Sequence, residues 1–270
     1  MSLYYLIGLL FGVVNTIRHR VRGYRTPRPF DDSDIDRAIA HDESVVDRWA
    51  ARGDLSFIGM KILELGPGPD LGTGAIMLRR GAASYAAADL FPLAEAASEE
   101  FYARLSEKIG EFDREALSFT LVSFPDLHEL SEKFDLVVSN ATLEHIADIP
   151  SLFVALSHLL ADNGIMCHHV DAKTHMRWLR DRDPLNILRY SDTIYDRLLS
   201  FPGAPNRLRA VDYVDAAHRA GLDTRIVPGR KLDRSYPHVT ARFRNREDLD
   251  LLTFTVICSQ PSGDPEMKVI

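Results

Sequence analysis

The sequence predicts an α/β fold with a doubly wound, parallel sheet in one main domain. Three observations predict this class. Short apolar strand patterns alternate with helical segments from Lys61 onward, and a glycine-rich loop directly follows the first strand. The chain has 270 residues with 46% hydrophobic content, which is enough to bury one substantial core.

The N-terminal extension, residues 1–30, joins an apolar run to a basic one. Residues 3–14 are uncharged, and five arginines without any acid follow them. As a helix this run would span roughly 18 Å, against about 30 Å for a bilayer core. The arginines come after the apolar run and no small-residue cleavage site appears, so we expect no secretory signal. We favour peripheral contact of residues 3–28 with the inner membrane surface, with packing on the body or a partner subunit and a true span left open.

Charge and cysteine content limit the class of protein. The net charge is −7 despite the basic extension, so the body is acidic and a nucleic-acid partner is not expected. Cys167 and Cys258 each lie inside an apolar run, which predicts two buried free thiols. The interpretation is a protein of the cytoplasm, with the inner membrane surface as the open alternative.

Residues 31–260 form the predicted main domain after a proline-broken linker, and residues 261–270 form a loose tail. Apolar residues at helical spacing predict a first helix over 34–52. Strand and helix patterns then alternate along the chain. We expect strands at 61–65, 84–90, 117–122, 134–140 and 164–170, and helices at 74–81, 93–109 and 149–160.

The loop after the first strand predicts a ligand site, because such sheets bind ligands beyond the carboxyl ends of their strands. Gly66 and Gly68 allow the backbone to turn tightly and approach a ligand. Asp89 ends the next strand, where a carboxylate can accept the hydroxyls of a ribose. Leu71 interrupts the pyrophosphate fingerprint, and Glu64 would repel a diphosphate but suit a cationic amino-acid tail.

These residues resemble the first motif of the class I S-adenosylmethionine-dependent methyltransferases, E/D-x-G-x-G-x-G. Glu64, Gly66 and Gly68 match it, whereas the third glycine falls on Asp70. The resemblance continues through Asp89, "FDLVVSNATLEHI" and "LLADNGIMCHHV", roughly residues 55–170. It implies a Rossmann-like sheet of seven strands, with 223–229 and 251–259 as a final hairpin after a helix at 209–222.

The resemblance also implies the cofactor, S-adenosylmethionine, and its contacts. Ser123 and Phe124 stand where the family usually carries an acid for the adenine amine. The implied cofactor residues are Glu64, Gly66, Pro67, Gly68, Asp70, Gly72, Asp89, Leu90, Ser123, Phe124, Asn140 and Ala141.

An insert after the fifth strand, residues 171–209, is the predicted substrate side. Its basic residues outnumber its acids, and guanidinium groups pair well with carboxylate or phosphate. "LRYS" and "NRLR" elements similar to these occur in a subset of the family. The expected substrate residues are Asp171, Arg189, Tyr190, Asn206, Arg207 and Arg209.

Three histidines are the candidate bases for the acceptor: His168, His145 and His175. "SNATLEH" places Asn140, Glu144 and His145 near the methyl donor. Strand alternation puts His168 on one face and the next histidine on the other. No strong metal-ligand spacing is present, so no metal is predicted.

The leading hypothesis is a methyltransferase that acts on a small-molecule or glycan/lipid-linked acceptor, which would be anionic if the arginines bind it. In-line O-methylation with a histidine base is the expected mechanism. A homodimer is left open. The alternatives are a nicotinamide-dependent oxidoreductase or sugar-nucleotide enzyme on a related sheet, and a non-catalytic module that keeps the fold.

Overall fold

The computed structural model describes residues 3–22, 34–201, 203–233, 236 and 238–261. A seven-stranded sheet forms its centre, in the order β3-β2-β1-β4-β5-β7-β6. β7 runs antiparallel to both of its neighbours, and the other pairs are parallel. The strands are β1 Lys61–Leu65, β2 Ser84–Asp89, β3 Leu117–Leu121, β4 Phe134–Asn140, β5 Leu160–Asp171, β6 Asp223–Pro228 and β7 Thr253–Ser259. The predicted doubly wound, mostly parallel fold is confirmed.

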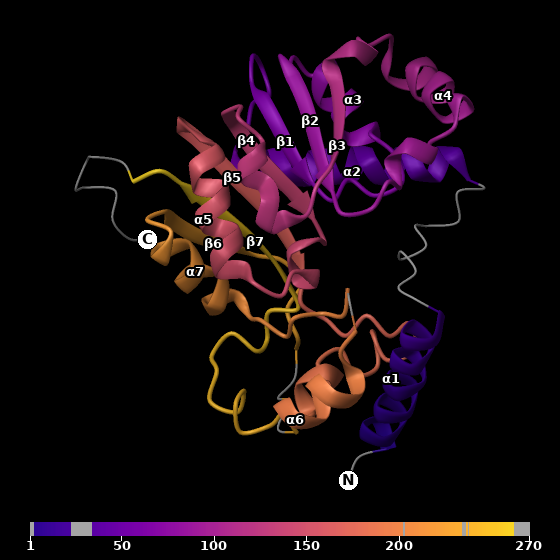
Figure 1. The fold of residues 1–270 in the computed structure, drawn as a ribbon, viewed down its shortest axis with the longest axis vertical. Coiled ribbons are helices and arrows are strands. Elements are labelled where there is room, and N and C mark those ends of the chain that lie inside the picture. Colours follow the sequence, from indigo (N-terminus) through magenta and orange to yellow (C-terminus); the bar gives the residue numbers. More distant parts are fainter. Residues whose placement is uncertain (1–2, 23–33, 202, 234–235, 237, 262–270) are drawn as a thin grey trace.

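Helices cover both faces of this sheet (Figure 1). α2 Ile35–Gly53, α3 Gly72–Arg79 and α4 Glu99–Ile109 lie on one face, and α5 Ile149–Leu159 and α7 Ala210–Arg219 lie on the other. α1 Leu3–Arg22 and α6 Asp192–Ile194 lie away from the sheet (Figure 1). Polar side chains set their starts: the carboxylate of Asp34 accepts the N–H of Arg37, and the hydroxyl of Ser98 accepts that of Phe101. Because Ser98 caps α4, the single helix predicted over 93–109 is wrong, and a 3-10 turn at Ala94–Ala96 precedes α4.

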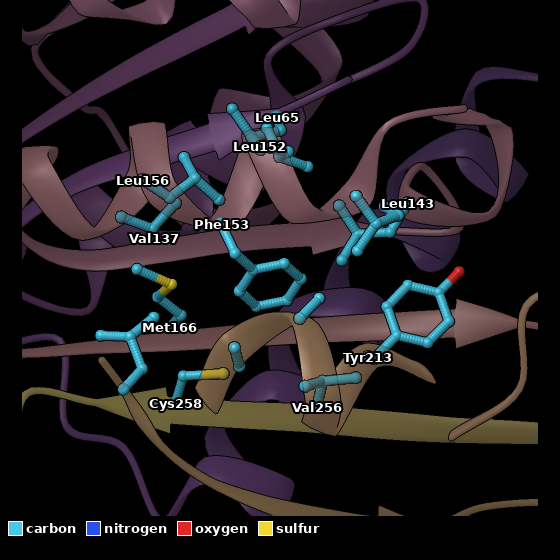
Figure 2. Packing of buried hydrophobic residues seen from close by; sticks show 14 of the residues in the cluster. Leu65, Val137, Leu143, Leu152, Phe153, Leu156, Met166, Tyr213, Val256 and Cys258 are labelled. Carbon is cyan, nitrogen blue, oxygen red and sulfur yellow. The ribbon is translucent and has the colours of Figure 1, made fainter. Parts of the chain in front are cut away.

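Alternating strand residues build a separate core on each face. On one face, Leu63 and Val137 pack with side chains of α5 and α7. Figure 2 shows Phe153 of α5 in this core, close to Val137 and Met166. On the other face, side chains of β1 and β4 pack with α2, α3 and α4 around the buried Trp49. Because both faces of the central strands are buried, these strands are short, nearly continuous apolar runs, and such runs predicted the sheet.

A third core lies beyond the sheet and joins three distant segments. Tyr190 and Leu199 of the insert pack there with Phe243, which lies between β6 and β7. Leu9 and Val13 of α1 complete it. Figure 1 shows α1 beside α6 at this end of the molecule. β6 and β7 pair as predicted, but residues 229–252 connect them, so the expected hairpin is not a tight one.

The N-terminal helix continues past the apolar run as far as Arg22. In the described part of the chain, no helix has both the length and the apolar character needed to cross a membrane. Cys167 and Cys258 are buried and free, as predicted. Residues 23–33, with most of the linker, and residues 262–270 of the predicted tail lie outside the described residues.

Candidate functional site

The loop between β1 and α3 requires two glycines for different reasons. Gly66 has φ of +67°, and a Cβ there would lie 2.6 Å from Oγ1 of Thr142. Gly68 has φ of +87°, and a Cβ there would meet no heavy atom within 4 Å. The backbone at Gly68 therefore borders open space, which a ligand can approach closely.

Asp89 lies next to this loop. The N–H of Gly66 donates to the carbonyl of Ala88 at 2.8 Å, so the loop begins beside the end of β2. Asp89 is 8% exposed, and one carboxylate oxygen accepts the N–H of Phe91 at 3.0 Å. Burial raises the pKa of this carboxyl. Leu90, the next residue, is half exposed beside it.

The other predicted residues of the loop make contacts within the protein. Oε2 of Glu64 accepts the hydroxyls of Thr73 at 2.5 Å and Tyr85 at 2.7 Å. Burial raises the pKa of Glu64 to about 7. Asp70 accepts the N–H of Gly72, the first residue of α3, at 2.8 Å. Pro67 lies between the two glycines.

The end of β4 faces the same loop. The hydroxyl of Thr142 donates to the carbonyl of Leu65 at 3.1 Å, which ties the two loops together. Ala141 has φ of +54°. Oδ1 of Asn140 accepts a guanidinium N–H of Arg48, on α2, at 2.7 Å. The predicted residues Asn140 and Ala141 thus lie at the same sheet edge as the glycine loop.

The loop after β3 contains an acid that the sequence reasoning missed. Ser123 donates its hydroxyl to the carboxylate of Asp126, which is exposed. Phe124 packs against the core. The N–H of Val122 donates to the carbonyl of Asp89 at 2.9 Å, so this loop lies beside the end of β2. The sequence does contain an acid in this loop, Asp126, but it lies three positions after Ser123, beyond the position where the family motif usually carries one.

Two of the three candidate bases meet in a partly buried polar cluster. The rings of His145 and His175 have centroids 4.8 Å apart. Oε1 of Glu144 lies 3.8 Å from Nε2 of His175 and accepts the N–H of Asp171 at 3.2 Å. Glu144 is 2% exposed, and its burial raises its pKa to about 8. The sequence placed Glu144 near the donor without giving it a role.

His145 is fixed by the insert. Its Nδ1 lies 2.7 Å from the carbonyl oxygen of Gly203. A carbonyl only accepts, so Nδ1 carries the ring proton and Nε2 keeps its lone pair. Burial lowers the pKa of His145. The neutral form is therefore the one present at neutral pH.

His168 lies apart from the other two candidate bases, in the core of the protein. Its ring is fully buried, with Nδ1 2.9 Å from Oγ of Ser139 and the ring edge against Phe153 of α5. Burial lowers its pKa to about 3. His168 shares the face of Met166 and Val170, so it points into the core under α5 instead of toward the loops. We do not retain it as a base.

The polar groups of the predicted substrate residues make contacts within the protein, and Asn206 also lines a cavity beside His145. Asp171 pairs with Arg180 and with Lys173, the latter at 3.5 Å. Arg189 pairs with Asp183 at 2.9 Å. Tyr190 is 1% exposed.

The arginines of the "NRLR" element hold the insert in place. Arg207 is 4% exposed, donates to the carbonyl of Tyr190 at 2.9 Å and pairs with Asp192 at 2.6 Å. Arg209 is fully buried and donates to the carbonyls of Ala172 and Leu251. Asn206 donates its amide to the carbonyls of Leu143 and Ile146, each at 2.9 Å, and so supports the turn that carries His145.

A cavity of about 700 Å³ opens next to His145. Arg20 and His19 of α1 line it on one side, and Tyr195 and Phe201 of the insert line another. The ring of His19 stacks on Phe201 with centroids 4.3 Å apart. The cavity therefore lies between the predicted N-terminal extension and the candidate base.

One atom each from Glu144, His145 and His175 lies within 4.8 Å of the others, so the three side chains could hold a metal ion. A carboxylate with two imidazoles suits zinc, iron or manganese better than calcium. The same three groups also suit proton transfer.

Seven strands in this order, with a glycine turn beside a carboxylate at the second strand, define a Rossmann-like methyltransferase. The model of a family described as "Methyltransferase domain" matches residues 37–225. The chain belongs to this family and is an S-adenosylmethionine-dependent methyltransferase. The nicotinamide-dependent and non-catalytic alternatives are therefore set aside.

Solved structures share the fold at low identity. An O-methyltransferase family protein from Burkholderia thailandensis has 13% identity and a TM-score of 0.54, covering 96% of this chain and 72% of that one. A Listeria monocytogenes protein assigned to the S-adenosylmethionine-dependent methyltransferases has 14% identity and a TM-score of 0.51, covering 83% and 99%. The CurJ carbon methyltransferase has 17% identity and a TM-score of 0.50, covering 96% and 67%. No curated protein matches this chain in sequence.

Proposed function

We propose that this methyltransferase methylates a hydroxyl oxygen of an anionic small-molecule or glycan/lipid-linked acceptor. The observation that carries the proposal is the position of His145. Its Nδ1 proton is held by Gly203, and its ring lines the cavity beside α1. A neutral imidazole with a free lone pair at the wall of a cavity is suited to take a proton from a bound hydroxyl.

In this mechanism the acceptor oxygen attacks the methyl carbon in line with the sulfur. The C–O bond forms as the S–C bond breaks, and the sulfonium becomes a neutral thioether. The hydroxyl proton passes to Nε2 of His145. The resulting imidazolium would be stabilised by the carbonyl of Gly203 and by the carboxylate of Asp171, because burial lowers the pKa of His145 while these two groups raise it.

The cofactor is proposed to bind across the edge formed by β1, β2 and β4. Gly66 and Gly68 let the backbone approach it, and Asp89 accepts the ribose hydroxyls. Asp126 is the proposed partner of the adenine amine, in the place expected for Ser123 and Phe124. The protein contributes mainly by alignment, which can supply about 7–11 kcal/mol of the barrier.

Arg20 is the residue of the cavity lining that supports an anionic acceptor, and Asp196 is the one acid among the described lining residues of the cavity. Arg20 reaches it from α1, and its guanidinium donates to the carbonyl of Arg197 at 3.2 Å. Arg20 thus takes the role predicted for Arg189, Arg207 and Arg209. The acidic body gives no support for a nucleic-acid acceptor.

We propose that the reaction takes place in the cytoplasm, at the inner membrane surface, which the two free thiols and the basic extension support.

The test is methyl transfer from labelled S-adenosylmethionine to a panel of hydroxyl-bearing anionic glycans and glycolipids. His145→Ala should lower kcat about 100-fold or more, because a positioned base contributes that much. The affinity for S-adenosylhomocysteine should stay within twofold. His218→Ala, on the exposed side of α7, is the matched control. Full turnover in His145→Ala would remove the proposed base.

A further inference from the structure

One side of α1 is an exposed, purely aliphatic stripe. Its members recur every three or four residues, so they lie on one face of the helix over its whole length. Each is between 47% and 77% exposed. They are Leu3, Leu6, Leu10, Val14, Ile17 and Val21.

The opposite side of α1 is fixed to the insert, so the stripe has to face outward. Gly8 packs so closely that a Cβ there would lie 2.1 Å from Oδ1 of Asn186. Gly12 packs against the side chain of Leu199, and a Cβ there would lie 2.4 Å from Cδ2 of Leu199. The hydroxyl of Tyr190 donates to the carbonyl of Tyr5 at 2.9 Å. A helix docked by half of its circumference lies along the protein surface, and its stripe is not available to the core.

The charges next to the stripe favour one partner over another. Arg18 and Arg20 are exposed near the end of α1, and residues 1–30 contain no acid. The α1 helix of a second copy would bring arginines against arginines, with no carboxylate on either helix to pair with them. An anionic lipid surface supplies both the apolar layer for the stripe and the phosphates for the guanidinium groups.

We propose that α1 lies flat on an anionic phospholipid bilayer, with the aliphatic stripe at the depth of the upper acyl chains. The same helix lines the cavity through His19 and Arg20. Docking therefore brings the cavity to the lipid surface, where an acceptor with a lipid anchor and an anionic head group can enter it. This last step rests on the proposed function, whereas the docking of α1 does not.

The experiment is co-sedimentation of the full chain with vesicles. Binding should be strong to phosphatidylcholine vesicles with about one third phosphatidylglycerol, weak to phosphatidylcholine alone, and reduced by salt. The double variant Leu10→Ser/Val14→Ser should bind at least tenfold more weakly. Arg18→Gln should weaken binding to the vesicles that contain phosphatidylglycerol and leave binding to phosphatidylcholine alone unchanged. Val154→Ser/Val211→Ser removes equally exposed side chains from α5 and α7 and should bind normally.

Two results would overturn the docking proposal. One is equal vesicle binding by wild type and Leu10→Ser/Val14→Ser. The other is a wild-type dimer in sedimentation velocity that this variant converts to a monomer without any vesicle binding, which would assign the stripe to a second copy of the chain. Turnover of soluble hydroxyl acceptors should be the same in this variant and wild type. If no such acceptor is methylated while vesicle binding persists, the proposed function fails and the docking stands.

Discussion

The Cα of Gly66 faces the side chain of Thr142, so that a Cβ at position 66 would lie 2.6 Å from Oγ1 and 2.7 Å from Cγ2. We expect Gly66→Ala to lower both thermal stability and cofactor affinity, because the positive φ adds about 1 kcal/mol of strain to the clash. Adding Thr142→Ala should restore part of the stability. Calorimetry with S-adenosylhomocysteine and thermal unfolding measure the two effects, and an unchanged Tm in the single variant would contradict the close packing.

Gly68 provides the contrasting case, because a Cβ there meets open space. Gly68→Ala should cost only about 1–2 kcal/mol of stability, from its positive φ. Cofactor affinity should fall at least tenfold, since the methyl group would project into the space that the ligand occupies. Equal cofactor affinity in wild type and Gly68→Ala would show that the ligand lies elsewhere.

Asp89 should matter for binding and not for folding. Asp89→Asn keeps an oxygen that can accept the N–H of Phe91, so Tm should change little. The loss of a charged acceptor for the ribose hydroxyls should weaken S-adenosylhomocysteine binding by about 10- to 100-fold. Asp162→Asn, exposed in β5, is the control. Normal binding in Asp89→Asn would separate Asp89 from the cofactor.

Asp42 makes stability depend on pH. Burial, with the neighbouring carboxylates of Asp70 and Glu64, holds the pKa of Asp42 well above its usual range. The folded protein keeps a proton that the unfolded chain releases near pH 4, so this group costs stability as pH rises. Asp42→Asn should therefore be close to neutral at pH 4 and stabilising by at least about 1 kcal/mol at pH 8. Urea unfolding at both pH values checks this, and Asp47→Asn, exposed on the same helix, should show no such trend.

Removal of metal ions should leave turnover within twofold, because His145 is proposed to act as a base. The measurement is activity after dialysis against a chelator, with metal content determined in parallel. A tenfold loss that zinc or manganese restores would assign Glu144, His145 and His175 to an ion instead. The cofactor affinity of the chelated protein is the control for folding.

Arg209 should prove structural. Arg209→Met keeps much of the side-chain volume but leaves the buried carbonyls of Ala172 and Leu251 without their donor. The free energy of unfolding should fall by about 3 kcal/mol. The variant that stays folded should bind S-adenosylhomocysteine normally. An unchanged stability together with a raised KM for the acceptor would return Arg209 to the substrate site.

Local signals explain which parts of the fold the sequence could predict. Gly66, Gly68 and Asp89 lie at strand ends, where apolar runs stop and backbone freedom is needed. The strands themselves followed from short apolar runs that alternate with helical segments. In contrast, the split before α4 depended on the cap at Ser98, which lies inside an otherwise helical pattern.

Long-range packing explains which side-chain environments at the site the sequence could not predict. Alternation separated His168 from its neighbour but did not say which face the helix α5 would cover. Arg207 and Arg209 looked like free cations because their partners, Tyr190 and Leu251, are distant in sequence. Glu144 is surrounded by Asp171, the last residue of β5, and by His175, and both are distant from it in sequence.

The third core couples three stretches of the chain, so that each limits how the others can change in an engineered variant or in a relative. Because α1, the insert and the chain between β6 and β7 share Tyr190, Phe243 and Leu9 in one apolar cluster, none of them can be exchanged alone. A chimera built to change acceptor choice has to transplant all three stretches at once, or it will expose the apolar side of whichever stretch was left behind. A relative in which only one of the three stretches differs should keep the side chains of that stretch that face the third core.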